Sequence, residues 1–331
     1  MSILLSLSIV VGLLALPVNA EEKDDDNYPN DLKITSHNVY MLSQNLYPNW
    51  GQVKRAGMIA DADYVEGNDV IIFNELFDNE ASDELLNQLE DQYPHQTPVL
   101  GRSKDGWDET QGSYSNLVPE DGGVGIVSKW PIAEKIQYVY EDACSADGMS
   151  NKGFVYVKVM KEGKPYHVIG THTQATDSLC LPGQSEDVRQ KQFQDIHTFI
   201  EDKEIPEDEV IFIGGDLNAK KNSDEYNEML DALHASNPSG YTGFDATWDP
   251  ETNSIAGYNY PDLDTQFLDY ILVDKDHAQP NDWYIHSHKI KSEPWSVTSW
   301  GQTYEYNDYS DHYPITGSSD PITEDDDGDL K

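Results

Sequence analysis

The sequence predicts a single α/β domain in which short β-strands alternate with amphipathic helices. Three observations favour this fold class. Apolar runs rich in β-branched residues recur along the chain, segments with apolar residues at helical spacing lie between them, and no Gly/Ser-rich linker, repeat or change in composition divides the sequence. A chain of 331 residues is long enough to bury a large core. We therefore expect one domain over residues 31–317.

Five apolar runs are predicted to be β-strands, and each carries polar residues near one end. The runs lie within residues 32–40, 69–77, 166–174, 210–218 and 267–273. The polar residues are Asn38, Glu75, His172, Asp216, Asn218 and Asp269. A single Asp or Asn at a strand end is usually a turn former or a helix cap. Because ligands bind at strand ends of α/β sheets, the whole set instead indicates a metal-assisted hydrolytic centre.

Two amphipathic helices are predicted between these strands. They cover residues 82–93 and 185–202, and both have apolar side chains at the spacing of one helix face. Each segment begins with a serine, and serine is a preferred N-cap because its side chain accepts a hydrogen bond from the first turn. We expect Ser82 and Ser185 to cap these helices.

The two ends of the chain differ from its middle. Residues 1–20 form an apolar run that ends in Val-Asn-Ala, which is typical of a secretory signal peptide cleaved after Ala20. A membrane anchor is the alternative, because no Lys or Arg precedes the run, but the run is short for a bilayer span. An acidic leader at 21–30 and an acidic tail at 318–331 are expected to be disordered. We therefore expect a secreted, extracellular protein.

Charge and cysteine content limit the classes of function. The chain has 61 Asp and Glu against 21 Lys and Arg, a formal net charge of −40. Binding to a polyanion needs clustered cations, so we expect no nucleic-acid partner. The excess of acid is interpreted as a solvated coat. Export permits a disulfide between the two cysteines, Cys144 and Cys180, and two free buried thiols are the alternative.

Six short motifs follow one another along the chain: HNVY (37–40), NELFD (74–78), GTHTQ (170–174), GGDLN (214–218), LDYIL (268–272) and YSDHYPI (309–315). In this order they resemble the endonuclease/exonuclease/phosphatase superfamily, and within it the secreted bacterial neutral sphingomyelinases, which are phospholipases C. The segments 114–132, 248–262 and 296–314 resemble the sphingomyelinases in particular. The resemblance implies a four-layer α/β sandwich, with two mixed β-sheets packed face to face and helices outside. It also places both cysteines where that family has its disulfide.

The resemblance assigns catalytic roles to the motif residues in phosphodiester hydrolysis. His312 is the expected general base, because imidazole titrates near neutral pH, and Asp269 would fix its tautomer. A surface loop histidine is the alternative for His312. Glu75, with Asn38 beside it, is the expected ligand of Mg²⁺, for which Mn²⁺ or Co²⁺ are alternatives.

Four further residues complete the implied centre. Asp216 would orient water or metal, and Asn218 would donate a hydrogen bond to phosphate. His172 would stabilise negative charge on the phosphoryl group. Asp311 would hold a metal-bound water or His172.

Two sites outside this centre also follow from the resemblance. Asn79, Glu120 and Asp121 lie where related enzymes hold a second divalent cation at the edge of the molecule, and a turn at 119–123 with exposed acids is the alternative. Asp249, next to Trp248, would help to place the choline headgroup, since a cation is attracted by acids and aromatic faces.

The aromatic segment 295–313 has two interpretations. Its rings would pack on the sheet, or Trp300 would lie at a hairpin tip and contact lipid. Family hairpins carry two large apolar residues at the tip, whereas here Gly301 follows Trp300. The expected function is a monomeric enzyme that hydrolyses sphingomyelin in the outer leaflet to ceramide and phosphocholine. The alternatives are an extracellular nuclease on the same scaffold and a lipid-binding toxin module without turnover.

Overall fold

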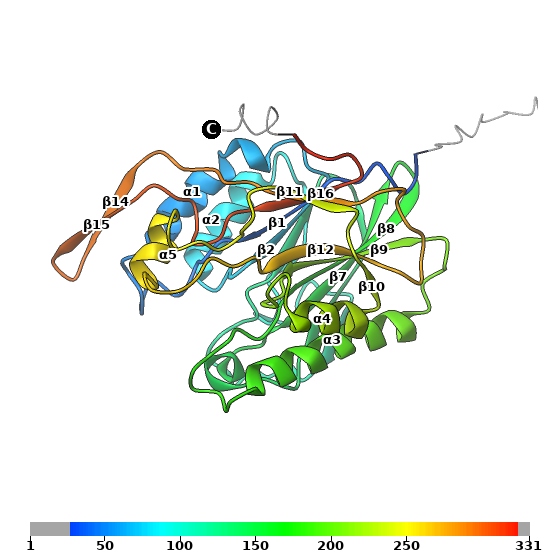
Figure 1. The fold of residues 1–331 in the computed structure, drawn as a ribbon, viewed down its shortest axis with the longest axis horizontal. Helices are drawn as coiled ribbons and strands as arrows, with labels where there is room; N and C mark the ends of the chain where they lie inside the picture. The colour runs from blue at the N-terminus through cyan, green and yellow to red at the C-terminus, as the bar shows by residue number, and fades with distance from the viewer. Residues whose placement is uncertain (1–26, 324–331) are drawn as a thin grey trace, which may run out of the picture.

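A computed structural model describes residues 27–323 of the chain, and in it two seven-stranded mixed β-sheets pack face to face with helices on their outer sides (Figure 1). This arrangement confirms the predicted four-layer sandwich. The strand order of the first sheet is β11-β13-β16-β1-β2-β5-β3, and that of the second is β10-β12-β9-β8-β7-β6-β4.

The strands of each sheet come from distant parts of the chain. The first sheet contains β1 (Ile34–Asn38), β2 (Val70–Asn74), β3 (His95–Gln96), β5 (Gly125–Ser128), β11 (Gly240–Gly243), β13 (Tyr284–Ser287) and β16 (Ile315–Ser318). The second contains β4 (Glu109–Gly112), β6 (Ile132–Val139), β7 (Gly153–Lys161), β8 (Lys164–His172), β9 (Val210–Asp216), β10 (Ala235–Ser236) and β12 (Asp269–Asp274). A separate hairpin is formed by β14 (Trp295–Ser299) and β15 (Gln302–Tyr306). The five strands predicted from apolar runs are β1, β2, β8, β9 and β12.

The surroundings of β2 explain why the predicted strands are continuous hydrophobic stretches. Side chains alternate between the faces of a strand, and both faces of β2 are covered. Val70 and Ile72 belong to the core between the two sheets, whereas Ile71 and Phe73 belong to the core beneath the helices. Each of these side chains is fully buried.

Helices cover the two outer faces of the sandwich. α1 (Gln52–Ala60) and α2 (Asn79–Leu89) lie over the first sheet, and α3 (Gln184–Lys203) and α4 (Asp224–Leu233) lie over the second (Figure 1). The short α5 (Ser254–Asn259) lies near the base of the β14–β15 hairpin. Ile59 of α1 and Leu85 of α2 share a buried cluster with Phe73, and Phe193 of α3 belongs to the large buried cluster that includes the strands of the second sheet. No helix in residues 27–323 is long and apolar enough to cross a bilayer.

The starts of α2 and α3 correct the predicted caps. α2 begins earlier than expected, and its N-cap is Asp78, whose side chain accepts from the backbone N–H of Ala81. Ser82 therefore lies inside the first turn and donates back to the carbonyl of Asp78. α3 follows Gly183, which has a left-handed backbone, so Ser185 is also inside its helix. Earlier residues start both helices, and a serine at the edge of the apolar pattern was not sufficient evidence for a cap.

One edge of the sandwich collects the strand ends that carry polar residues. β1 runs parallel to β2, and β8 runs parallel to β9, so the ends of these four strands lie at corresponding positions. β12 is antiparallel to β9 and β16 is antiparallel to β1, which brings the starts of β12 and β16 to the same ends. The side chain of Asn38, at the end of β1, contacts that of Asp216, at the end of β9. The two sheets therefore present their polar residues at one common edge.

The N-terminal boundary of the folded part lies before Asp31. Tyr28, which the sequence placed in a loose leader, packs against the core and donates its hydroxyl to the carbonyl of Pro165 (2.9 Å). The same hydroxyl accepts from the backbone N–H of Val210 (2.8 Å). The predicted signal peptide lies outside the described residues, as does most of the predicted acidic tail.

Candidate active site

A pocket of about 360 Å³ opens at the polar edge. Six of the predicted site residues line it: Glu75, His172, Asp216, Asn218, Asp311 and His312. Asn38 and Asp269 are buried directly behind it and hydrogen bond to the lining side chains. The structure thus brings together the predicted catalytic set from strands far apart in the sequence.

His312 is held by Asp269 with one ring nitrogen directed to the pocket. Its Nδ1 lies 2.8 Å from Oδ2 of Asp269, so Nδ1 carries the proton and donates it. The other nitrogen, Nε2, lies 3.6 Å from Oδ2 of Asp216. Burial opposes the charged form of the ring, but the carboxylates of Asp269, Asp216 and Asp311 outweigh burial and raise the pKa of His312 well above its usual value. Nε2 therefore faces the pocket, and the three carboxylates would stabilise the charged ring that forms when Nε2 takes up a proton.

Backbone contacts explain why the last polar motif of the chain reaches the site. The hydroxyl of Ser310 donates to the carbonyl of Asn38 (2.6 Å), which ties the motif to the end of β1. The carbonyl of His312 accepts from Nε2 of His37 (3.1 Å). Burial lowers the pKa of His37 to about 3, so this ring is neutral and its Nδ1 accepts from the hydroxyl of Tyr64. The neutral imidazole of His37 therefore holds the backbone of His312 in place.

Glu75 presents an unsatisfied carboxylate oxygen to the pocket. Its backbone has φ 62°, a left-handed conformation that costs free energy in a residue with a side chain. Oε1 accepts from Nδ2 of Asn38 (2.8 Å), while Oε2 is buried with no hydrogen-bond partner among the described residues. One ligand atom from each of Glu75, His172 and Asp216 lies within 4.8 Å of the others. Burial, together with the nearby Asp311, raises the pKa of Glu75 to about 7. This donor set suits a divalent cation that prefers oxygen ligands.

Asp216 and Asn218 form the floor of the pocket. Asp216 accepts from Nδ2 of Asn38 (3.0 Å), and burial followed by the charge of Asp269 raises the pKa of Asp216 to about 6. Asn218 has a left-handed backbone, φ 52°, and its N–H donates to Oδ1 of Asp216 (3.1 Å). The side-chain amide of Asn218 donates to the carbonyl of Thr173 (3.2 Å). Since an amide nitrogen carries two hydrogens, one donor of Asn218 remains for a ligand.

Lys152 is a site residue that the sequence did not reveal. Its buried Nζ pairs with Oδ2 of Asp147 (2.8 Å) and lies 3.4 Å from both Nε2 of His172 and the carbonyl of Thr173. Nε2 of His172 also lies 3.6 Å from Oδ2 of Asp216. Burial, and next the charge of Lys152, lower the pKa of His172 well below its usual value. The neutral ring therefore lines the pocket, and the ammonium group of Lys152 lies behind it.

The model of one known family covers this whole constellation. The family is described as Endonuclease/Exonuclease/phosphatase, and its model matches residues 35–312. The chain belongs to this family. The predicted superfamily is therefore confirmed, and the chain is a hydrolase of the phosphodiesterase class.

Bacterial phospholipases C are close relatives of this phosphodiesterase. Sphingomyelinase C of Listeria ivanovii is 56% identical over 295 residues, which cover 89% of this chain and 88% of that protein. A sphingomyelinase C of Bacillus cereus is 53% identical over 320 residues, covering 94% and 95% of the two chains. A phospholipase C of Staphylococcus aureus is 53% identical over 316 residues, covering 96% and 94%.

Solved structures agree with the fold of the phosphodiesterase. A crystal structure of a beta toxin mutant from Staphylococcus aureus, which holds bound magnesium ions, is similar with a TM-score of 0.87 and 54% identity, covering 88% of this chain and 100% of that one. Sphingomyelinase C from Streptomyces griseocarneus has a TM-score of 0.86 and 46% identity, covering 87% and 99%.

The predicted edge residues of the phosphodiesterase line a second, polar pocket. Asn79, Glu120 and Asp121 lie on the walls of this pocket, which measures about 210 Å³. Asp121 is engaged there, because Oδ2 pairs with Nε of Arg102 (2.9 Å) and Oδ1 accepts from the N–H of Gly123 (2.9 Å). Burial raises the pKa of Asp121 to about 6. A cation bound by Asp121 would have to share this carboxylate with Arg102.

Two predicted residues have partners other than those expected. Asp249 is buried, and its carboxylate accepts from the hydroxyls of Thr252 and Thr265, so it fixes its own loop and does not line the pocket. The position of Asp249 next to Trp248 in the sequence therefore did not determine where its carboxylate points. The carboxylate of Asp311 hydrogen bonds to the side chains of Trp248 and Ser310, not to His172.

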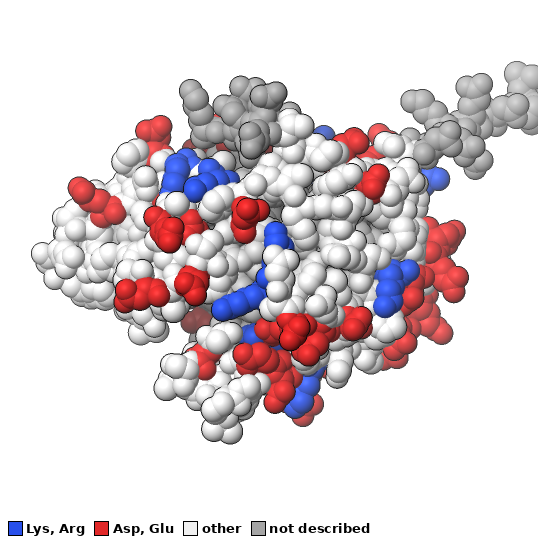
Figure 2. Space-filling model, in the orientation of Figure 1, with Lys and Arg blue, Asp and Glu red and all other residues white. Residues whose placement is uncertain are grey.

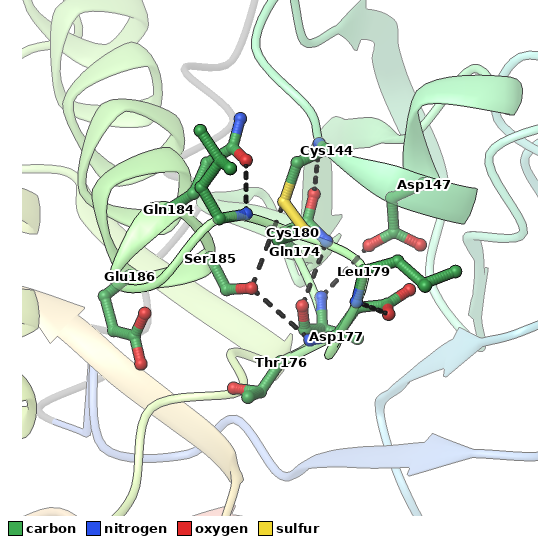
Figure 3. Close-up of a disulfide and its surroundings, with 12 residues drawn as sticks. Cys144, Asp147, Gln174, Thr176, Asp177, Leu179, Cys180, Gln184, Ser185 and Glu186 are labelled. Atoms are coloured by element: carbon green, nitrogen blue, oxygen red, sulfur yellow. Dashed lines mark hydrogen bonds between the residues drawn. A yellow bond between two sulfur atoms is a disulfide. The ribbon is translucent and has the colours of Figure 1, made fainter.

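Cys144 and Cys180 form the expected disulfide (Figure 3). It joins the segment after β6 to the turn that precedes α3. The N–H of Cys144 donates to Oε1 of Gln174 (2.9 Å), two residues beyond His172. The disulfide thus fixes two loops that border the pocket.

The aromatic hairpin packs against the main body at its base and exposes a tryptophan at its tip. At its base, Trp295 and Tyr306 pack into a cluster with Trp50 of the main body. At its tip, Trp300 is 67% exposed. Trp300 and Gly301 have φ values of 51° and 75°, as a two-residue turn between paired strands requires. Gly301 therefore serves the turn, and Trp300 is the only large apolar residue of the two at the tip, with the ring of Tyr304 beside it.

Proposed function

We propose that this phosphodiesterase is a secreted, Mg²⁺-dependent sphingomyelin phosphodiesterase that releases ceramide and phosphocholine. The observation that carries the proposal is the pairing of His312 with Asp269 opposite the unsatisfied oxygen of Glu75 in one pocket. The relatives named sphingomyelinase C, at 52–56% identity, support the choice of substrate. The net charge of −40 disfavours a nuclease, because DNA is a polyanion.

The donor set of the pocket fits Mg²⁺. Glu75 would hold the cation through Oε2, and Asp216 and Asn38 would lie beside it. Hard oxygen ligands with room for water suit this ion, and a related beta toxin structure holds magnesium. When bound, the cation would supply Lewis-acid stabilisation of the charge that develops on the phosphoryl and leaving oxygens. Mn²⁺ and Co²⁺ remain alternatives, and Asn79, Glu120 and Asp121 would hold a second cation at the edge.

The side chains divide the remaining chemistry. His312 takes a proton from water at Nε2 while the water oxygen forms a bond to phosphorus, and Asp269 stabilises the resulting imidazolium. Asn218 donates a hydrogen bond to a phosphoryl oxygen, and His172 with Lys152 stabilises the negative charge. The bond from phosphorus to the ceramide oxygen breaks, and that oxygen is protonated as the product leaves.

The pocket walls suit a choline phosphate. Tyr40, Trp248 and Tyr260 line it together with carboxylates, and a quaternary ammonium group is attracted by aromatic faces and by negative charge. The enzyme acts as a monomer on the outer leaflet, with Trp300 of the hairpin entering the lipid interface.

Phosphocholine release tests the proposal. The mature chain is incubated with sphingomyelin vesicles or phosphatidylcholine vesicles, with Mg²⁺, Mn²⁺ or Co²⁺, or with a chelator. We expect rapid release from sphingomyelin with Mg²⁺ and loss of release with the chelator. No release from sphingomyelin under any of the three cations would contradict the proposal. Nicking of plasmid DNA by the same preparation would favour the nuclease alternative.

A further inference from the structure

The exposed large apolar side chains of residues 27–323 all lie in segments that leave the pocket edge. They are Leu46, Tyr47, Leu117, Met149, Leu179, Leu181, Tyr258, Tyr260, Leu263 and Trp300. Exposed large apolar side chains are common singly, but their restriction to one edge is not expected of a solvated surface. This edge therefore differs from the rest of the molecule.

Sheet topology establishes that these segments share an edge. β4 is parallel to β6, and both run in the direction of β8, because β7 is antiparallel to β6 and to β8. The segments after β4, β6 and β8 therefore leave the same edge as His172, and they carry Leu117, Met149, Leu179 and Leu181. In the first sheet, β11 and β13 run in the direction of β1, so the segments that follow them leave this edge too.

Two groups of these apolar side chains lie on either side of the pocket. One group is the hairpin with the loop after α5, and this loop lines the pocket with Tyr260 and Leu263. The other group is the disulfide turn, which we define as residues 176–183, and it directly follows Ala175 in the pocket wall. The hairpin tip and the turn before α3 both appear as uncharged protrusions on the same side of the molecule in Figure 2.

The disulfide turn is built to present its leucines to solvent. Leu179 and Leu181 flank Cys180 and are 83% and 72% exposed. The N–H of Leu179 donates to Oδ1 of Asp177 (2.8 Å), and the N–H of Leu181 donates to Oε1 of Gln184 (2.9 Å). The bond from Cys180 to Cys144 ties the turn to a second loop, and the side chain of Leu179 extends away from it in Figure 3. Two leucines are thus held outward by a covalently fixed backbone.

We propose that Leu179 and Leu181 form a second lipid contact, so that the enzyme rests on a zwitterionic bilayer through the hairpin on one side of the pocket and the disulfide turn on the other. This inference rests on the proposed function, since it assigns the position in which that enzyme meets its bilayer substrate. A chain of net charge −40 gains no attraction from an anionic surface, so apolar contacts must hold it on lipid. The same charge disfavours a second copy of the chain as the occupant.

Two contacts on a rigid body also orient it. A single exposed indole would let the enzyme rotate about the hairpin tip, whereas contacts on both sides direct the pocket between them toward the headgroups. Ala175 and Thr176 on one wall and Tyr260 and Leu263 on the other would then meet the lipid surface together.

Vesicle binding tests the second contact without relying on turnover. Wild type, L179S/L181S, L179F/L181F and S178A are sedimented with sphingomyelin and phosphatidylcholine vesicles in the presence of a chelator. We expect L179S/L181S to lower the partition coefficient about tenfold or more, because two leucines no longer enter lipid. The phenylalanine variant should bind at least as tightly as wild type, and S178A, an exposed polar position of the same turn, should bind normally. An unchanged partition coefficient for L179S/L181S would overturn the inference.

Two further measurements separate this inference from its alternatives. Hydrolysis of a water-soluble, monomeric short-chain sphingomyelin should be retained by L179S/L181S, and an equal loss on this substrate would place the leucines in the chemistry and overturn a lipid role. Sedimentation velocity identifies a protein partner, since a wild-type dimer that dissociates in L179S/L181S would assign the turn to a second copy. Failure of wild type to hydrolyse either substrate contradicts the proposed function alone, because vesicle binding is measured separately.

Discussion

The ammonium nitrogen of Lys152 lies 3.4 Å from Nε2 of His172, inside the wall of the pocket. Lys152 is buried, and its carboxylate partner is Asp147, whose Oδ2 also accepts from the N–H of Ala175. The pair therefore joins a cation, the loop of the disulfide and a pocket histidine in one connected unit.

Removal of the positive charge of Lys152 should impair catalysis. Lys152→Met should lower kcat about 100-fold, because a preorganised positive charge near the phosphoryl oxygens is lost. It should also destabilise the fold, because Asp147 remains without its partner. The control is Lys152→Met combined with Asp147→Asn, which should recover thermal stability but not kcat. A wild-type kcat for Lys152→Met would show that the charge does not act on the reaction.

Loss of the proposed base should separate catalysis from folding. His312→Ala should lower kcat by about 100-fold to 10,000-fold, and Asp269→Asn should also lower it, because the imidazole is then held in the wrong tautomer. The Tm of both variants, followed by circular dichroism, should stay within a few degrees of wild type. His95→Ala, at a half-buried histidine of β3, is the matched control and should keep its rate. Retained turnover in His312→Ala would assign the base to another group.

Stability should depend on pH in a way that reports the metal site. In the folded protein the pKa values of Glu75 and Asp216 are raised to about 7 and 6, from ordinary values of 4.5 and 3.8. The neutral acids are thus favoured in the fold, so their contribution to stability is present below about pH 4 and is lost as pH rises through 6 and 7. We expect the Tm of chelated protein to fall between pH 5 and pH 8.

Added Mg²⁺ should reverse this loss. A cation bound by the ionised carboxylates stabilises the folded state, so the rise in Tm on adding Mg²⁺ should be larger at pH 8 than at pH 5. Glu75→Gln cannot ionise, so it should weaken both the pH dependence and the response to Mg²⁺. Equal responses of Glu75→Gln and wild type to Mg²⁺ would place the cation elsewhere.

The disulfide should contribute to global stability. Its cysteines are separated by 36 positions, and closing a loop of this size removes about 3 to 4 kcal/mol of unfolded-state entropy. The double variant with Ser at Cys144 and Cys180 should lose roughly that amount in the free energy of unfolding, measured in urea. Wild type reduced before unfolding should behave like this variant. A loss in the variant alone would indicate a packing effect of serine rather than the loss of the link.

Strands and site were predictable from sequence to different degrees. The strands could be predicted because a short run such as Val70–Asn74 has apolar side chains on both of its faces. Such a run is typical of a strand that is covered on both sides. The ordered motifs led to Glu75 and His312, although only the fold shows that they share one pocket. The helix starts were missed because Asp78 and Gly183, both earlier in the chain, begin α2 and α3.

Other parts of the site depend on contacts that no local pattern encodes. Lys152 precedes β7 without any distinguishing neighbour, and its role appears only when antiparallel pairing sets the start of β7 beside the end of β8. Asp249 stands next to a pocket tryptophan in the chain, yet the hydroxyls of its own loop determine where its carboxylate points. The sequence identifies the residues, but it does not determine the direction in which their side chains point.

The turn between β7 and β8 is a suitable attachment site for a label, because it lies at the end of β8 opposite to His172 and the pocket. Glu162 and Gly163 are exposed there with left-handed backbones, and a side chain added at Gly163 would meet nothing within 4 Å. A fluorophore or affinity label attached at this turn would be carried away from the pocket edge, so the labelled enzyme could be followed on vesicles, or immobilised on a sensor chip, with its working side facing outward.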